Sequence, residues 1–275
     1  AMMLGKLIKN DIKTGLYTVA NVYFAAFVAI AFMMFGVLAK SGTIKVLSSV
    51  ALSVIMVVIL VFTFFAVISM FNKSVYGNVG YLTLTLPVKE WQIVFSKTLT
   101  GILFILISYI SFITSNAFLF VYILGQKGMQ TVIELWQQME IMGLPSRETL
   151  ELYLIMKSLT GLIAVFFTVS SLIIAVSLVN VSGIDKFGTI GSILIFALLT
   201  GFLTSLANKI GKMINLNMVI YGKSVVFTFS NSFVARQNEL GAMSFELSRY
   251  FFLIVFSLCL CAAATFLIKK RVNVK

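Results

Sequence analysis

Long apolar runs recur along nearly the whole chain, and they constrain the fold more than any other feature of the sequence. A helix needs about 20 apolar residues to cross a bilayer, and the runs reach this length repeatedly. Of the 275 residues, 60% are hydrophobic and only 11% are charged, with a mean hydropathy of +1.06. Such a composition lies far outside the range of a soluble domain. The sequence therefore predicts an all-α membrane protein with a single domain over residues 1–275.

The runs predict six transmembrane helices. They cover residues 16–39, 46–71, 98–124, 158–181, 189–207 and 250–268. Before the first run, Leu4, Leu7, Ile8 and Ile12 recur at helical spacing opposite lysines, which predicts an interfacial helix lying in the membrane surface. A basic tail without such a helix is the alternative interpretation.

Two segments between the spans carry structure of their own. Residues 131–142 have one apolar face that includes Trp136, so we expect an interfacial helix there, and Ser146 is a predicted N-cap for the helix that follows. Residues 213–221 and 225–235 are apolar but too short to cross a membrane. We expect them to form a re-entrant or interfacial hairpin on the outer side, before the sixth span.

Several classes of function are excluded by residues that the chain lacks. It contains no histidine, which removes Ser-His triads and histidine-ligated metals. No G-x-x-x-x-G-K-[ST] motif is present, so the chain does not hydrolyse ATP through a P-loop. The predicted second to sixth spans carry no charged residue, which argues against proton- or sodium-coupled transport. We therefore expect no enzyme activity, no catalytic residue and no metal site.

Small and polar residues within two spans allow more than one interpretation. In the third span, hydroxyl and amide side chains either line a pathway or connect helices. They are Ser108, Ser111, Thr114, Ser115 and Asn116. In the fifth span, Ala197, Gly201 and Ser205 lie four residues apart, a stripe that lets two helix backbones approach closely. The spacing alone leaves open whether the second helix belongs to the same subunit or to another.

The inner loop between the second and third spans is the most informative stretch. Residues 72–97 alternate apolar and threonine residues up to Pro87 and then become amphipathic, whereas a simple connector would be polar. The pattern indicates a surface that contacts another protein. An ordinary loop with a helix that begins near Pro87 is the alternative.

Within this loop, the run Gly80-Tyr81-Leu82-Thr83-Leu84-Thr85-Leu86-Pro87-Val88, followed by Ser96-Lys97, resembles the signature of ABC-2 type permeases. These are six-span exporter subunits of bacteria. Relatives often have an acidic residue before the glycine, where this chain has Val79. The six spans, the surface helix and the hairpin before the last span fit the same family.

The resemblance implies that the loop couples the chain to a separate nucleotide-binding ATPase subunit, which would hold ATP and Mg²⁺, while this chain binds no cofactor. The implied coupling residues are Tyr76, Asn78, Gly80, Tyr81, Leu82, Thr83, Leu84 and Leu86. It also implies that two permeases pair, as a homo- or heterodimer, through the first and fifth spans. The implied dimer residues are Ala25, Ala29, Ala197, Gly201 and Ser205.

The implied function is export of a hydrophobic or amphipathic substrate, such as a peptide, across the bacterial inner (plasma) membrane. Basic residues at Lys6, Lys9 and Lys13, and the Lys269-Lys270-Arg271 end of the last span, place both termini in the cytoplasm. Membrane lipid is the other expected partner, and nucleic acid is not, because the cations are not gathered in one basic stripe. A passive channel or a membrane-remodelling protein without an ATPase is the alternative function.

Overall fold

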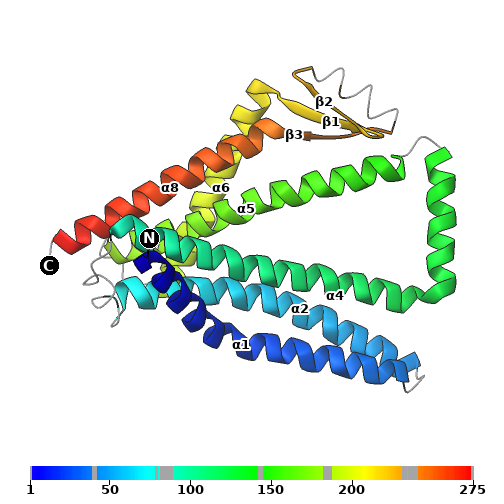
Figure 1. The fold of residues 1–275 in the computed structure, drawn as a ribbon, viewed down its shortest axis with the longest axis horizontal. Coiled ribbons are helices and arrows are strands. Elements are labelled where there is room, and N and C mark those ends of the chain that lie inside the picture. Colours follow the sequence, from blue (N-terminus) through cyan, green and yellow to red (C-terminus); the bar gives the residue numbers. More distant parts are fainter. Residues whose placement is uncertain are drawn as a thin grey trace. The chain divides into compact units, whose positions relative to one another are not determined.

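The computed structural model describes residues 2–38, 42–77, 80, 89–141, 145–181, 188–230, 234 and 241–273 (Figure 1). The helices are α1 (Met2–Leu38), α2 (Gly42–Phe71), the π-helix η1 (Asn72–Tyr76), α4 (Glu90–Ile141), α5 (Arg147–Val181), α6 (Gly188–Ile214) and α8 (Leu247–Asn273). The strands are β1 (Asn217–Tyr221), β2 (Ser224–Thr228) and β3 (Met243–Glu246).

In the described part of the chain, five helical segments are long and apolar enough to cross a membrane. They are Val50–Tyr76, Glu90–Ser115, Arg147–Val181, Gly188–Ile214 and Leu247–Lys270. They agree with the second to sixth predicted spans, so the chain is a helical multi-pass membrane protein. The first predicted span, 16–39, falls largely within α1, but many of its side chains lie outside the described residues, and the five segments do not include it.

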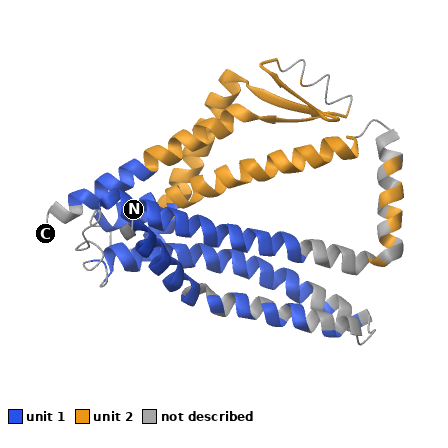
Figure 2. Ribbon diagram, in the orientation of Figure 1, with its two compact units in different colours: residues 1–123, 172–193, 261–275 blue, residues 124–171, 194–260 orange. Residues whose placement is uncertain are grey.

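Contacts divide the chain into two compact units (Figure 2). Unit 1 comprises residues 1–123, 172–193 and 261–275, and unit 2 comprises residues 124–171 and 194–260. Helices α4, α5, α6 and α8 each begin in one unit and end in the other. Because the boundary falls inside continuous helices, the expectation of a single domain stays a prediction.

In unit 1, α1 and α2 form a hairpin, and the first part of α4 runs in the same direction as α1 (Figure 1). The core of this group is on α2, where Leu52, Met56 and Ile59 are buried. Tyr23 of α1 and Phe112 of α4 pack against them. Side chains from all three helices thus share one apolar core.

Unit 2 has a core of its own and a small sheet. Phe167 of α5, Ala207 of α6 and Leu253 of α8 are buried together. The strands form an antiparallel sheet of three strands in the order β2-β1-β3. This sheet corrects the all-α prediction: the hairpin expected before the last span is built from strands β1 and β2, and its place at the membrane stays a prediction.

The local sequence explains the strands. β1 and β2 are rich in valine, isoleucine and aromatic residues, which favour extended backbone. Two residues, Gly222 and Lys223, join them, and Gly222 has a positive φ of 56° that suits a glycine in a tight hairpin turn. Pairing of the strands satisfies the backbone groups of segments too short to cross the membrane as helices.

Two smaller predictions concern helix ends. The Ser146 hydroxyl accepts a hydrogen bond from the Thr149 N–H at 3.4 Å, which confirms Ser146 as the N-cap of α5. In α4, Gly125 has non-helical backbone angles (φ 62°, ψ −174°), and the helix then continues to Ile141. This second part of α4 contains most of the predicted helix at 131–142, whose place at the membrane interface stays a prediction.

Candidate functional site

One face of the first turns of α1 is buried, and it carries a charge. Leu7, Asp11 and Gly15 follow one another at four-residue spacing, and all three are buried, whereas Lys9 and Lys13 are exposed. Residues at this spacing lie on one face of a helix. The amphipathic character predicted for this helix is confirmed, and its place at the membrane surface stays a prediction.

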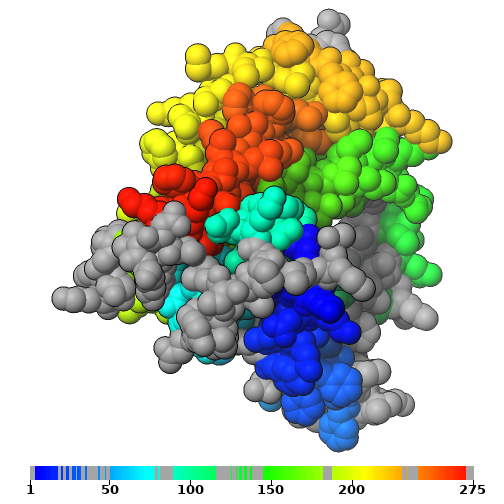
Figure 3. Space-filling model, turned by 60° about the vertical axis from the view of Figure 1, so that its left-hand side comes forward, coloured from blue at the N-terminus to red at the C-terminus, as the bar shows by residue number. Residues whose placement is uncertain are grey.

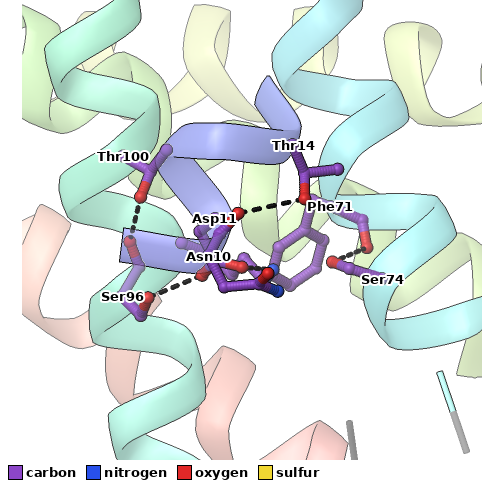
Figure 4. Close-up of polar contacts among 8 residues, drawn as sticks. Asn10, Asp11, Thr14, Phe71, Ser74, Ser96 and Thr100 are labelled. Atoms are coloured by element: carbon purple, nitrogen blue, oxygen red, sulfur yellow. Dashed lines mark hydrogen bonds and ion pairs between the residues drawn. The ribbon is translucent and has the colours of Figure 1, made fainter. Parts of the chain in front are cut away.

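Asp11 is held by two side chains of α4. The Ser96 hydroxyl donates to Asp11 Oδ2 at 2.6 Å, as Figure 4 shows, and the Lys97 ammonium forms an ion pair with Asp11 Oδ1. The side chains of Lys97 and Asp11 are only 4% and 5% exposed. A buried charge without a partner is costly, so these contacts fix the start of α1 against the start of α4.

Further along, α1 and α4 remain in contact. A Cβ placed on Gly15 would lie 2.2 Å from a ring carbon of Phe104, so the absence of a side chain lets the two helices approach. The Tyr23 hydroxyl hydrogen-bonds to Ser108 at 2.6 Å, and Ser108 hydrogen-bonds to Thr63 of α2 at 2.7 Å. Hydroxyl pairs and close packing therefore connect α1, α2 and α4 along their length.

After α2, the chain widens into the π-helix η1 and then turns at Gly77 and Gly80. The Gly77 N–H donates to the carbonyl of Asn72 at 2.8 Å, and the Gly80 N–H donates to the carbonyl of Gly77 at 2.8 Å. A Cβ on Gly80 would lie 2.4 Å from the carbonyl oxygen of Val75, so only glycine fits there without a shift of the backbone. Asn180 of α5 donates to the Asn72 side chain at 3.2 Å and connects this turn to another helix of unit 1.

Two of the predicted coupling residues belong to this turn. Tyr76 is the last residue of η1, and its ring lies 6.1 Å from the Phe71 ring, while Gly80 is buried against Val75. The other predicted coupling residues lie outside the described residues. They are Asn78, Tyr81, Leu82, Thr83, Leu84 and Leu86.

The predicted dimer residues of the fifth span are at the surface of α6. Ala197, Gly201 and Ser205 are exposed, and a Cβ on Gly201 would meet nothing within 4 Å. Within the described residues, this surface is therefore open to a helix or to lipid. Ala25 and Ala29 lie in α1, and their side chains are outside the described part of the chain.

Most hydroxyl side chains of the third predicted span form hydrogen bonds within the protein. Ser108 bridges α1 and α2, Ser115 is buried, and Ser111 and Thr114 donate to backbone carbonyls of their own helix at 2.8 and 2.9 Å. This arrangement favours the helix-packing interpretation over a pathway. The side chain of Asn116 lies outside the described residues.

Sequence reasoning missed the ion pair. Lys97 lies one residue before the predicted third span but inside the candidate segment Glu90–Ser115, because the helix begins eight residues earlier than predicted. A carboxylate on the apolar face of an amphipathic helix was the available signal for Asp11. Such an ion pair has a structural role: it holds two helices together and makes or breaks no covalent bond.

Within the described ranges, no three potential metal-ligating side chains come together. Comparison of the chain with protein-family models, with curated proteins and with solved structures gives no match.

Proposed function

We propose that this multi-pass membrane protein is the permease subunit of a bacterial ABC exporter. The loop after η1 would bind a separate ATPase subunit, which would hold ATP and Mg²⁺ and carry out the hydrolysis. The permease would contribute no covalent chemistry. The proposal rests on the resemblance of residues 80–88 and Ser96-Lys97 to the ABC-2 signature.

One observation carries the proposal furthest: the two residues that end the resemblance, Ser96 and Lys97, are the two that hold Asp11. The loop is therefore anchored at its far end to the start of α1, and at its near end to η1 through the Gly77–Gly80 turn. If a partner protein displaces the loop, the displacement would be transmitted both to the start of α1 and to the Gly77–Gly80 turn.

This arrangement supports a mechanism for the proposed transporter. ATP would draw two ATPase subunits together, and the loop of each permease would move with its ATPase as a rigid body. Because α1 contacts α4 from Asp11 to Tyr23, movement at the start of α4 would displace α1 as well. The pathway would then open alternately to either side for a hydrophobic or amphipathic substrate such as a peptide.

A second permease copy would complete the transporter. The exposed stripe at Ala197, Gly201 and Ser205 supports this part of the proposal, because small residues allow close helix approach. Gly201→Leu should reduce crosslinking between two permease copies more than Leu198→Phe does. Equal crosslinking in the two variants would show that the stripe is not part of the dimer interface.

The deciding experiment tests the loop. Tyr81→Ala/Leu84→Ala permease should lose ATPase binding in a pull-down and lose stimulated hydrolysis, with a loss on the order of 2 kcal/mol or more if the two residues are binding hot spots. The matched control, Tyr221→Ala/Val226→Ala, removes an exposed tyrosine and an exposed valine from the sheet and should bind normally. If the Tyr81/Leu84 variant is present at normal abundance, binds the ATPase normally and stimulates hydrolysis normally, the coupling role is contradicted. The alternative function, a channel or a membrane-remodelling protein, would then be favoured.

Orientation has its own test. With cytoplasmic termini, Gln137 would lie outside and Lys89 inside. In a chain with Cys259 and Cys261 replaced, an impermeant thiol reagent should label Gln137→Cys in intact cells and spare Lys89→Cys. The opposite pattern would reverse the orientation and place the loop away from a cytoplasmic ATPase.

A further inference from the structure

The sheet of unit 2 exposes several large apolar side chains, most of them on or beside its edge strand β2 and one, Tyr221, at the end of the central strand β1. Phe227 is 61% exposed, Phe229 just beyond β2 is 67% exposed, and Tyr221 and Val226 are exposed as well. Figure 3 shows the gold and orange side chains of this part of unit 2 at the molecular surface. Aromatic residues left in water at this density would be unfavourable, so the edge needs an apolar or interfacial environment.

The register shows which part of the sheet is covered by protein. Phe227, Met218 and Phe245 are aligned across the three strands and so lie on one face. At β3 this face is covered, because Phe245 makes an edge-to-face contact with Tyr153 of α5 at 5.9 Å. At β2 the same face is open, as the exposure of Phe227 shows.

The sheet is fixed at the ends of two candidate spans. Two residues separate the end of α6 from β1, and β3 runs directly into α8. The Leu247 N–H donates to the carbonyl of Leu216 at 2.9 Å, and the Ser248 hydroxyl donates to the carbonyl of Gly211 at 2.9 Å. Once α6 and α8 cross a bilayer, these bonds hold the sheet at the level of the lipid headgroups.

Cations lie on the two helix ends that lead into the sheet. Lys209 and Lys212 are exposed in the last turns of α6, and Arg249 is in the first turn of α8, where its backbone N lies 3.2 Å from a Cβ placed on Gly211. Among the described residues, none of the three forms an ion pair, and the buried Nε of Arg249 has no hydrogen-bond acceptor. The two exposed lysines at the end of α6 are therefore open to an anion, and the Arg249 guanidinium beside them in the fold also lies over the Tyr250 ring, 5.9 Å from its centroid.

We propose that the sheet is a lipid-interface anchor. Phe227 and Phe229 insert into the boundary between headgroups and acyl chains, and Lys209, Lys212 and Arg249 bind the phosphates of anionic phospholipids. Aromatic rings beside lysines are the combination that the interface favours, since the ring needs an apolar layer and the ammonium a charged one. This inference depends on the spans alone and is independent of the ATPase.

The test uses the full chain in lipid nanodiscs with a single tryptophan. In a Trp91→Phe/Trp136→Phe background, Phe227→Trp should be quenched by brominated lipid at a depth of about 5–10 Å and only weakly by aqueous iodide. Brominated phosphatidylglycerol should quench it more than brominated phosphatidylcholine. Phe229→Trp is a second reporter, in case the first variant does not fold.

Two matched controls test the role of the cations. Lys209→Gln/Lys212→Gln should reduce the preference for phosphatidylglycerol, by about fivefold for each charge removed. Phe202→Trp, on an exposed position of α6 away from the lysines, should be quenched equally by both lipids. Equal quenching by the two lipids at Phe227→Trp would overturn the phosphate-binding role.

The remaining outcomes also contradict the anchor. Strong iodide quenching without lipid quenching would place the edge in water. Protection of both reporters from iodide and lipid would mean that protein, such as a second copy of the chain, covers the edge strand.

Discussion

Among the residues that the structure describes, two ion pairs join distant parts of the sequence, and they differ mainly in burial. In unit 1, Lys97 and Asp11 are 4% and 5% exposed, whereas in unit 2, Lys223 and Glu148 are 80% and 55% exposed at a distance of 3.1 Å. Water screens the second pair and is excluded from the first. An ammonium–carboxylate pair therefore fixes a helix in unit 1, whereas a pair of the same kind adds little to the stability of a turn in unit 2.

The largest expected effect comes from breaking the buried pair. Lys97→Met leaves the Asp11 carboxylate buried without its cation, so the free energy of unfolding should fall by about 3–5 kcal/mol. Unfolding of the purified chain by sodium dodecyl sulfate in mixed micelles measures this change. Lys9→Met, on the exposed face of the same helix, is the control and should change stability little.

A double variant tests whether burial is the cause. Asp11→Leu/Lys97→Met removes both charges and should restore most of the lost stability, because no buried charge remains. Ser96 would lose its acceptor, but a serine in a helix can donate to its own backbone instead. If the double variant is as unstable as Lys97→Met, loss of packing rather than an unpaired charge would explain the result.

The second prediction concerns the close approach of α1 and α4. Gly15→Ala places a Cβ 2.2 Å from the Phe104 ring and should destabilise the chain by about 1–3 kcal/mol, despite the better helix propensity of alanine. Gly5→Ala is the matched control, since nothing lies within 4 Å of that position, and it should stabilise the helix by about 1 kcal/mol. Equal effects at the two positions would contradict the close contact at Gly15.

The third prediction moves to unit 2, where Thr149 holds the β1–β2 turn. Its hydroxyl accepts from the Gly222 N–H at 2.8 Å and hydrogen-bonds to Ser146 at 2.9 Å, and the side chain is buried. Thr149→Val removes the acceptor at similar volume and should cost about 1–3 kcal/mol, because the Gly222 N–H is left unsatisfied. Thr149→Ser keeps the hydroxyl and should recover most of that loss.

The sequence predicts the spans and a helix cap but not the sheet. The spans follow from the length of apolar runs, which a bilayer fixes, and the N-cap at Ser146 follows from local backbone chemistry. The sheet was missed because two short apolar runs were assigned by length. A glycine turn at Gly222 between β-branched runs was the signal for strands.

The ion pair could be predicted only in part. Asp11 on an apolar helix face signals a buried partner, but 86 residues separate it from Lys97, and the partner depends on how helices associate. The resemblance pointed to Ser96 and Lys97 without giving their role. Local patterns therefore locate spans and caps, while contacts between distant residues require the fold.

The smallest effect is expected at the exposed pair. Lys223→Ala removes the charge opposite Glu148 and should change the free energy of unfolding by less than about 1 kcal/mol, since water already solvates both groups. The change should shrink further at 1 M salt, where the Debye length is about 3 Å. The loss in Lys97→Met should persist in the same salt, because ions do not reach a buried pair. A salt-insensitive loss of several kcal/mol in Lys223→Ala would mean that this turn is buried in the folded protein, and the contrast between the two units would no longer hold.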